Sequence, residues 1–171
     1  TMVQLNKENV ELGHKIAMQV AAMKPIALDE ASVPQEVKDN EFQVAVEKTK
    51  EEQIEKAVEV ALKKAGLNPN LVDSEDHIES NIKKGWLTRE DADKALVIKK
   101  EAAEQKAANL PEQMIQNIAK GRLAKFLKEC CLVNQEFQFD DGDKTSVADY
   151  LKKQDKDLAI VAYKRFTLVA E

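Results

Sequence analysis

The residues best suited to nucleophilic or metal chemistry are two histidines, His14 and His77, and two adjacent cysteines, Cys130 and Cys131. A nucleophilic cysteine needs a base within hydrogen-bond reach, and a metal site needs several ligands at a fixed spacing. The sequence contains no His-x-x-x-His or Cys-x-x-Cys pair, and nothing in it places a histidine beside Cys130. We therefore expect the cysteines to pack as small hydrophobic side chains, with no metal ion and no disulfide framework.

An acidic run, Asp140-Asp-Gly-Asp143, contains oxygen ligands that calcium could use. It lacks the ligand spacing of a calcium loop and the glutamate that closes one. Aspartate and glycine are typical turn residues, so we interpret the run as a turn. The five glycines are isolated from one another, and no phosphate-binding loop is present. The motifs thus predict no cofactor and no enzymatic activity.

The single tryptophan, Trp86, lies in the string Lys-Lys-Gly-Trp-Leu between two expected helices. A tryptophan in such a place is either an exposed anchor for a binding partner or a plug that closes the tip of a helical hairpin. We favour the plug. The alternating charges of residues 48–64 and 89–106 also have a structural interpretation, since such charges are typical of solvated helix surface rather than of an interaction surface.

Length and composition limit the remaining possibilities. The 171 residues predict one domain with a substantial core. With 26 Lys plus Arg against 31 Asp plus Glu, the net charge of −5 disfavours nucleic-acid binding. Only five Gly and four Pro favour long helices over a sandwich or barrel. No apolar run approaches the roughly 18 residues of a membrane span and no signal peptide is visible, so we expect a cytoplasmic protein without membrane contact.

Apolar spacing, capping residues and stop residues predict a largely helical chain. The spacing of apolar residues follows the helical period, and Pro25, Gly66 and Gly85 fall where helices should end. Small residues on the inward face of the fourth helix allow close packing against a neighbour. The expected helices span about residues 8–23, 34–65, 74–84, 88–108, 111–128 and a short stretch from Ser146.

The pattern changes after Cys130. Phe137 and Phe139 alternate with polar neighbours, which predicts a short extended segment, and Leu158–Leu168 is rich in β-branched residues, which predicts a strand. The sequence therefore predicts an α+β fold. It should be helix-rich, with a small antiparallel sheet, packed helices and a long projecting helical hairpin.

Several stretches resemble bacterial elongation factor Ts. The string His14-Lys-Ile-Ala-Met-Gln-Val-Ala-Ala-Met-Lys-Pro25 is similar to a helix that the family writes as HIAMHVAA or HDIAMQIAA, followed by a short link and proline. Five further matches follow in the family's order: Val33-Pro-Gln-Glu-Val37, Lys120-Gly-Arg-Leu-Ala-Lys-Phe126, Gln135-Glu-Phe137, Lys144-Thr145 and Arg165-Phe166.

The resemblance covers about residues 2–47 and 104–169. It implies that residues 1–47 and 104–171 form the family's C-terminal core subdomain. Residues 48–103 have no counterpart in short-hairpin members, and their place in the order implies an extension of the coiled-coil, or dimerisation, hairpin.

Members of this family bind elongation factor Tu and promote release of its GDP, which is exchange by binding rather than enzymatic catalysis. A factor that binds the empty form of its partner more tightly must weaken nucleotide binding in return. The family's Thr-Asp-Phe-Val wedge is absent from this sequence. The resemblance thus implies a part of the factor that supplies docking and lacks the exchange wedge. The alternative is a structural self-association module that forms a homodimer through the hairpin.

The resemblance also assigns the contact residues. The expected partner-binding residues are His14, Lys15, Gln19, Phe137, Gln138 and Phe139. The family's two contact histidines fall on Lys15 and Gln19, with His14 one place from the first. The family's apolar contact pair falls on Gln138 and Phe139, so Phe139 is the expected hydrophobic anchor. Phe137 supports it, and we favour burial of Phe137 in the core over direct contact.

Overall fold

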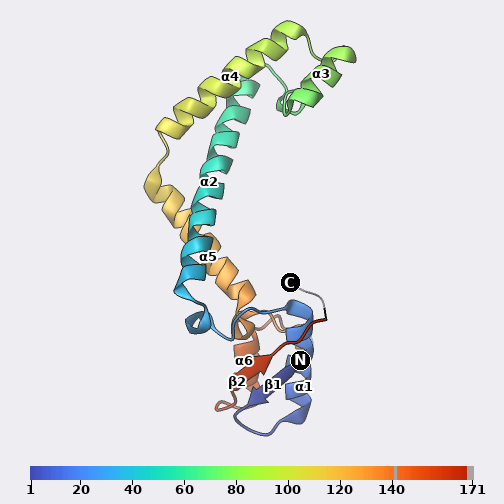
Figure 1. The fold of residues 1–171 in the computed structure, drawn as a ribbon, viewed down its shortest axis with the longest axis vertical. Helices are drawn as coiled ribbons and strands as arrows, with labels where there is room; N and C mark the ends of the chain where they lie inside the picture. The colour runs from blue at the N-terminus through green and yellow to red at the C-terminus, as the bar shows by residue number, and fades with distance from the viewer. Residues whose placement is uncertain (141, 169–171) are drawn as a thin grey trace. The chain divides into compact units, whose positions relative to one another are not determined.

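The computed structural model describes residues 1–140 and 142–168. Within these residues the chain forms helices joined by short connections, with two strands near its ends (Figure 1). The elements are β1 (Met2–Leu5), α1 (Val10–Met23), η1 (Glu30–Ser32), α2 (Gln35–Lys64), η2 (Pro69–Leu71), α3 (Glu75–Lys83), α4 (Arg89–Ala108), α5 (Glu112–Cys130), η3 (Leu132–Asn134), α6 (Val147–Gln154) and β2 (Ile160–Lys164). The predicted helix-rich α+β class is confirmed.

The chain divides into two compact units, each described here by itself. Unit 1 comprises residues 1–42 and 121–171, and unit 2 comprises residues 43–120. Each of the helices α2 and α5 is divided between the two units, whereas the sheet lies in unit 1.

The sheet pairs β1 with β2 in antiparallel register, from Met2 opposite Lys164 to Leu5 opposite Ile160. The predicted strand over Leu158–Leu168 is too long, because β1 offers only four residues to pair with. Beyond Lys164 the side chain of Phe166 is 72% exposed. Its alternation with Leu168 was therefore not a sign of a buried face.

Unit 1 is held by a core in which α1, α6 and the strand ends meet. Its buried members are Leu12, Ile16, Val20, Leu132, Phe137, Val147, Leu151, Leu158 and Ile160. A second buried cluster joins Ala27 and Val33 to Leu127 and Cys131 of the α5 end. Burial of these apolar side chains is the main stabilising contribution to this unit.

Capping side chains set the helix starts. Asn9 Oδ1 accepts from the Leu12 amide at 3.1 Å, so α1 begins at Val10 rather than at the predicted residue 8. Thr88 and Ser146 cap α4 and α6 as predicted. Each hydroxyl accepts from the backbone amide three residues later and donates to the aspartate carboxylate there, so the N-cap is held by two hydrogen bonds.

Unit 2 has its own core around the C-terminal end of α2. The amide of Leu67 donates to Leu62 across Gly66, whose φ of 76° suits a left-handed stop. The buried members of the unit 2 core are Leu62, Val72, Ile78, Leu87, Ala92 and Ala95.

The plug interpretation of Trp86 is wrong. Trp86 is 64% exposed, and its neighbour Leu87, 8% exposed, fills the core instead. The chain turns at Gly85, and the backbone amides of Trp86 and Leu87 both donate to the carbonyl of Asn81. In this turn Leu87 is directed into the small core and Trp86 toward solvent.

The predicted extended segment around Phe137 and Phe139 is reduced to a single antiparallel bridge, Glu136 with Ser146, followed by a turn. The turn is organised by Asp140, whose carboxylate accepts from the Gly142 amide and from both the amide and the hydroxyl of Thr145. This agrees with the turn expected at 140–143, although position 141 lies outside the described residues.

Two features are absent from the described residues, a membrane-spanning helix and a metal-binding cluster. None of their helices combines the length and apolar character needed to cross a membrane. The same residues hold no group of three or more His, Cys, Asp or Glu side chains placed to bind a metal.

The Asp140 turn predicts a pH-dependent stability. The Thr145 amide above all holds the pKa of Asp140 below its ordinary 3.8. A lowered folded-state pKa stabilises the protein above the unfolded value, and this stabilisation is lost as pH falls through the folded value. Asp140→Asn should therefore be less stable than the parent at neutral pH, with the deficit shrinking below about pH 4.

Urea unfolding at several pH values measures this deficit. Asp93→Asn, on the exposed surface of α4, is the matched control and should show none. A deficit of equal size at neutral and acid pH would mean that Asp140 acts through shape alone.

Candidate functional site

Gln19, a buried side chain of α1, holds the segment after α5 through two hydrogen bonds. Its amide nitrogen donates to the carbonyl of Glu136 at 3.1 Å, and its amide oxygen accepts from the backbone amide of Gln138 at 3.1 Å. The side chain has no exposed surface. Both ends of one amide are thus used to hold residues 136–138 against the helix.

Gln135 completes this arrangement. It is 2% exposed, and its amide nitrogen donates to the carbonyl of Glu129 at 2.8 Å. Its oxygen faces the Gln19 amide nitrogen at 3.4 Å. From the sequence, Gln135 stands out only as the first residue of the motif Gln135-Glu-Phe137. Its immediate neighbours, Asn134 and Glu136, are polar, so no local signal marks this amide as buried.

We call the hydrogen bonds from Gln19 to residues 136 and 138 the Gln19 clamp. The two phenylalanines next to this clamp differ in exposure. Phe137 is 1% exposed and packs in the core of unit 1, with its ring centroid 4.5 Å from that of Tyr150. Phe139 is half-buried, and its ring lies edge-on to Phe137 at 5.8 Å. Gln138, between them, is exposed. Phe139 and Gln138 therefore present surface to solvent, whereas Phe137 supports them from beneath.

His14 and Lys15, the first two residues of the expected site, lie on α1 about one turn before Gln19. Lys15 is half-buried and forms an ion pair with Glu11 at 3.3 Å. Because Lys15 precedes Gln19 by four residues, the two share one helix face. His14 is exposed and lies about 100° further round the helix.

The structure thus separates the six expected residues into two groups. Gln19 and Phe137 are interior residues of unit 1, where they position the segment. The accessible ones are His14, Lys15, Gln138 and Phe139, with Lys15, Gln138 and Phe139 all near the Gln19 clamp. We call residues Lys15, Gln138 and Phe139 the clamp surface.

A polar hollow of about 660 Å³ lies on unit 1 beside the Glu136–Ser146 bridge. It is lined by Glu30, Ala124, Lys128, Asn134, Glu136, Lys144, Thr145, Ser146 and Asp149. Carboxylates and ammonium groups are mixed in this lining. Such a surface suits a polar protein segment better than a single small anion.

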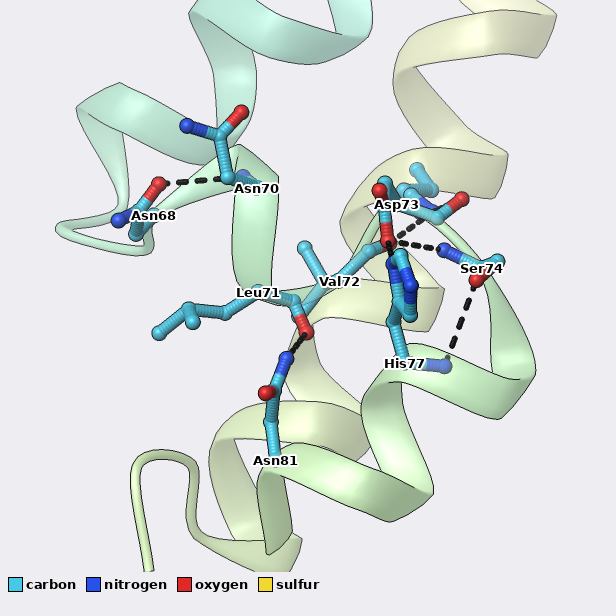
Figure 2. Close-up of polar contacts among 9 residues, drawn as sticks. Asn68, Asn70, Leu71, Val72, Asp73, Ser74, His77 and Asn81 are labelled. Atoms are coloured by element: carbon cyan, nitrogen blue, oxygen red, sulfur yellow. Dashed lines mark hydrogen bonds and ion pairs between the residues drawn. The ribbon is translucent and has the colours of Figure 1, made fainter. Parts of the chain in front are cut away.

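The residues with catalytic potential are not arranged for catalysis. Burial raises the pKa of Cys131 to about 12 and also raises that of Cys130, so neither thiol is an activated nucleophile. The two sulfur atoms are 3.7 Å apart and both cysteines are free. His77 contacts Asp73 at 2.6 Å in unit 2 (Figure 2), and this hydrogen bond is the main cause of the lowered pKa of Asp73.

The fold is that of a helix-rich α+β protein in which unit 1 exposes the clamp surface. Comparison with known proteins identifies its family. The family model for elongation factor TS matches residues 1–59 and 44–170. The chain belongs to the elongation factor Ts family.

Curated relatives agree over the whole chain. The elongation factor Ts of Phocaeicola vulgatus is 62% identical over 171 residues, all of this chain and 51% of the relative. That of Parabacteroides distasonis is 61% identical, also over all of this chain and 51% of the relative. That of Bacteroides fragilis is 60% identical over 172 residues, all of this chain and 52% of the relative. The chain therefore spans about half the length of these relatives. No solved structure matches it.

The clamp predicts a specific stability loss. Gln19→Met preserves side-chain length but leaves the Gln138 amide and the Glu136 carbonyl without this partner. The Glu136 carbonyl keeps a second donor in the side-chain amide of Gln138, whereas the Gln138 backbone amide loses its acceptor. A polar group left without its partner costs about 1–3 kcal/mol, so the variant should lose about that much unfolding free energy in urea. Gln138→Ala, which changes only an exposed side chain, should stay within about 0.5 kcal/mol. Equal stability of Gln19→Met and the parent would contradict a structural role for the amide.

Proposed function

We propose that this chain docks on elongation factor Tu and supports the release of its GDP during translation elongation in the cytoplasm. Family membership supports the choice of partner, and the clamp surface is the contact region we propose. The exchange would work by binding alone. A factor with higher affinity for the empty form lowers the affinity of its partner for nucleotide by the same factor, so no catalytic residue and no cofactor is needed.

One observation carries the proposed contact region. The buried Gln19 amide holds residues 136–138 against α1, which leaves Gln138 exposed and Phe139 half-exposed over a packed core. An aromatic side chain held in this way loses little conformational freedom on binding, which favours affinity. Lys15 adds a positive charge on the same helix face, and His14 lies next to it.

The two-part domain organisation belongs to the same proposal. Residues 1–47 and 104–171 would form the core subdomain that carries the clamp surface, and residues 48–103 the extended hairpin. Because the Thr-Asp-Phe-Val wedge does not occur in this sequence, we propose docking as the contribution of this region.

Self-association is the second candidate function. On α4, Leu96 and Val97 are 46% and 55% exposed although both are apolar. A shallow apolar hollow of about 400 Å³ lies on the same helix, lined by Glu90, Asp93, Lys94, Val97 and Ile98. Exposed apolar side chains beside a hollow are typical of an interface between two copies, which here would form a homodimer.

Variants of the clamp surface test the docking proposal. Phe139→Ala should weaken the complex with nucleotide-free elongation factor Tu about tenfold or more, because aromatic anchors dominate interface energies. Phe139 also contacts the core, so Gln138→Ala provides a second variant that leaves folding intact. Sedimentation velocity of the mixture measures binding. Val10→Ala, 78% exposed in the same unit, is the matched control. Unchanged binding in both clamp variants would exclude this surface as the contact.

A charge on α4 tests the second candidate. If copies associate through α4, the sedimentation coefficient of the chain alone should rise with concentration, and Val97→Glu should abolish that rise by burying an unpaired carboxylate. Val44→Glu, equally exposed on α2, is the control. A concentration-independent monomer would eliminate self-association as a function of this chain.

A further inference from the structure

The turn that carries Trp86 is built on a rigid base in unit 2. Asn81 donates from its side chain to the carbonyl of Leu71 at 2.9 Å (Figure 2), which ties α3 to η2. Lys99 of α4 donates to the carbonyl of Val72, and its ammonium lies 3.3 Å from the carbonyl of Asp73. Three elements are thereby joined around the small core beneath the turn.

The backbone of the turn is fixed on this base. Gly85, with a φ of 73°, reverses the chain after α3, and its amide donates to Ile82. The amides of Trp86 and Leu87 both donate to the carbonyl of Asn81, at 2.9 and 3.3 Å. Because Leu87 is buried, Trp86 is held outward with its ring largely in solvent.

Cationic side chains flank Trp86 in the chain, and one of them lies over its ring. Lys83, Lys84 and Arg89 are all exposed, and the ammonium of Lys84 lies 4.9 Å from the ring centroid of Trp86. Neither Lys83 nor Arg89 takes part in an ion pair between described residues. Glu79, one turn before Lys83, forms none with it.

The nearest carboxylates on α4 are already engaged. Asp91 accepts from the Thr88 hydroxyl at 2.8 Å, and Glu90 pairs with Lys94 at 3.0 Å. The turn therefore combines an exposed aromatic face with three cations that form no ion pair with the described residues. Gly85 and buried Leu87 flank Trp86 in the chain, so neither adjacent residue adds an exposed apolar side chain to the ring.

We propose that residues 83–89 bind single-stranded nucleic acid, with a base stacked on Trp86 and phosphates held by Lys83, Lys84 and Arg89. Every base has a π face, and aromatic stacking combined with cations is how proteins bind unpaired strands without reading sequence. Lys84 covers one face of the ring, and the base stacks on the other. The net charge of −5 describes the whole chain, whereas this contact needs only three local cations.

Fluorescence of Trp86, the single tryptophan, reports the contact directly in the full chain. A uridine oligonucleotide of about eight nucleotides should quench it. Neutralising three phosphates of a single strand predicts that log affinity falls with log salt at a slope of about −2. A thymidine oligonucleotide should bind similarly, since stacking does not require a 2′-hydroxyl.

Variants separate stacking from simple charge attraction, with anisotropy of a labelled oligonucleotide as the readout. Trp86→Leu keeps an exposed apolar side chain but removes the π face, so affinity should fall at least about fivefold, whereas Trp86→Phe should retain part of it. Lys83→Ala should reduce the salt slope by about 0.7, and Lys50→Ala, an exposed lysine on α2, should leave it unchanged.

Three results would overturn the proposal. They are the absence of quenching by either oligonucleotide at low salt, equal binding by Trp86→Leu and the parent, and equal quenching by polyglutamate. The last would mean that the turn attracts any polyanion, including an acidic protein segment, and does not stack bases.

Discussion

The arrangement of unit 1 depends on how the buried Gln19 amide is satisfied. Gln19 satisfies a donor and an acceptor of the segment after α5, and the buried amide of Gln135 lies beside it. A buried backbone amide or carbonyl without a partner is costly, so this segment has few ways to pack against α1 other than the one observed. That constraint keeps Phe137 in the core and leaves Gln138 and Phe139 at the surface. The proposed contact region is a consequence of how the core satisfies its polar groups.

Local rules were sufficient to predict most of the helices from sequence. Hydroxyl caps such as Thr88 and Ser146 and the stop at Gly66 act within a few residues, and the helical spacing of apolar side chains is equally local. The predicted strand over Leu158–Leu168 was too long because the length of a strand depends on the strand with which it pairs. β1 provides four residues, and no pattern within Leu158–Leu168 contains that information.

The candidate site was only partly predictable, because burial depends on residues distant in sequence. The resemblance brought α1 and residues 137–139 together, and the expected burial of Phe137 is confirmed, but the resemblance could not show that Gln19 is interior. Trp86 and Leu87 present the same difficulty, since two adjacent large apolar residues compete for one small core. Three hydrogen bonds of Asn81 fix the turn in which Trp86 is the exposed residue. These hydrogen bonds could not be predicted from the sequence.

Backbone hydrogen exchange of the chain, free and mixed with nucleotide-free elongation factor Tu, tests the central claim most directly. The claim is that the clamp surface of unit 1 is the docking region. Binding should slow exchange of amides around Gln138 and in the turn of α1 that contains Lys15, while amides of residues 83–89 keep their rates. Slowed exchange confined to unit 2, with residues 135–140 unaffected, would contradict the account.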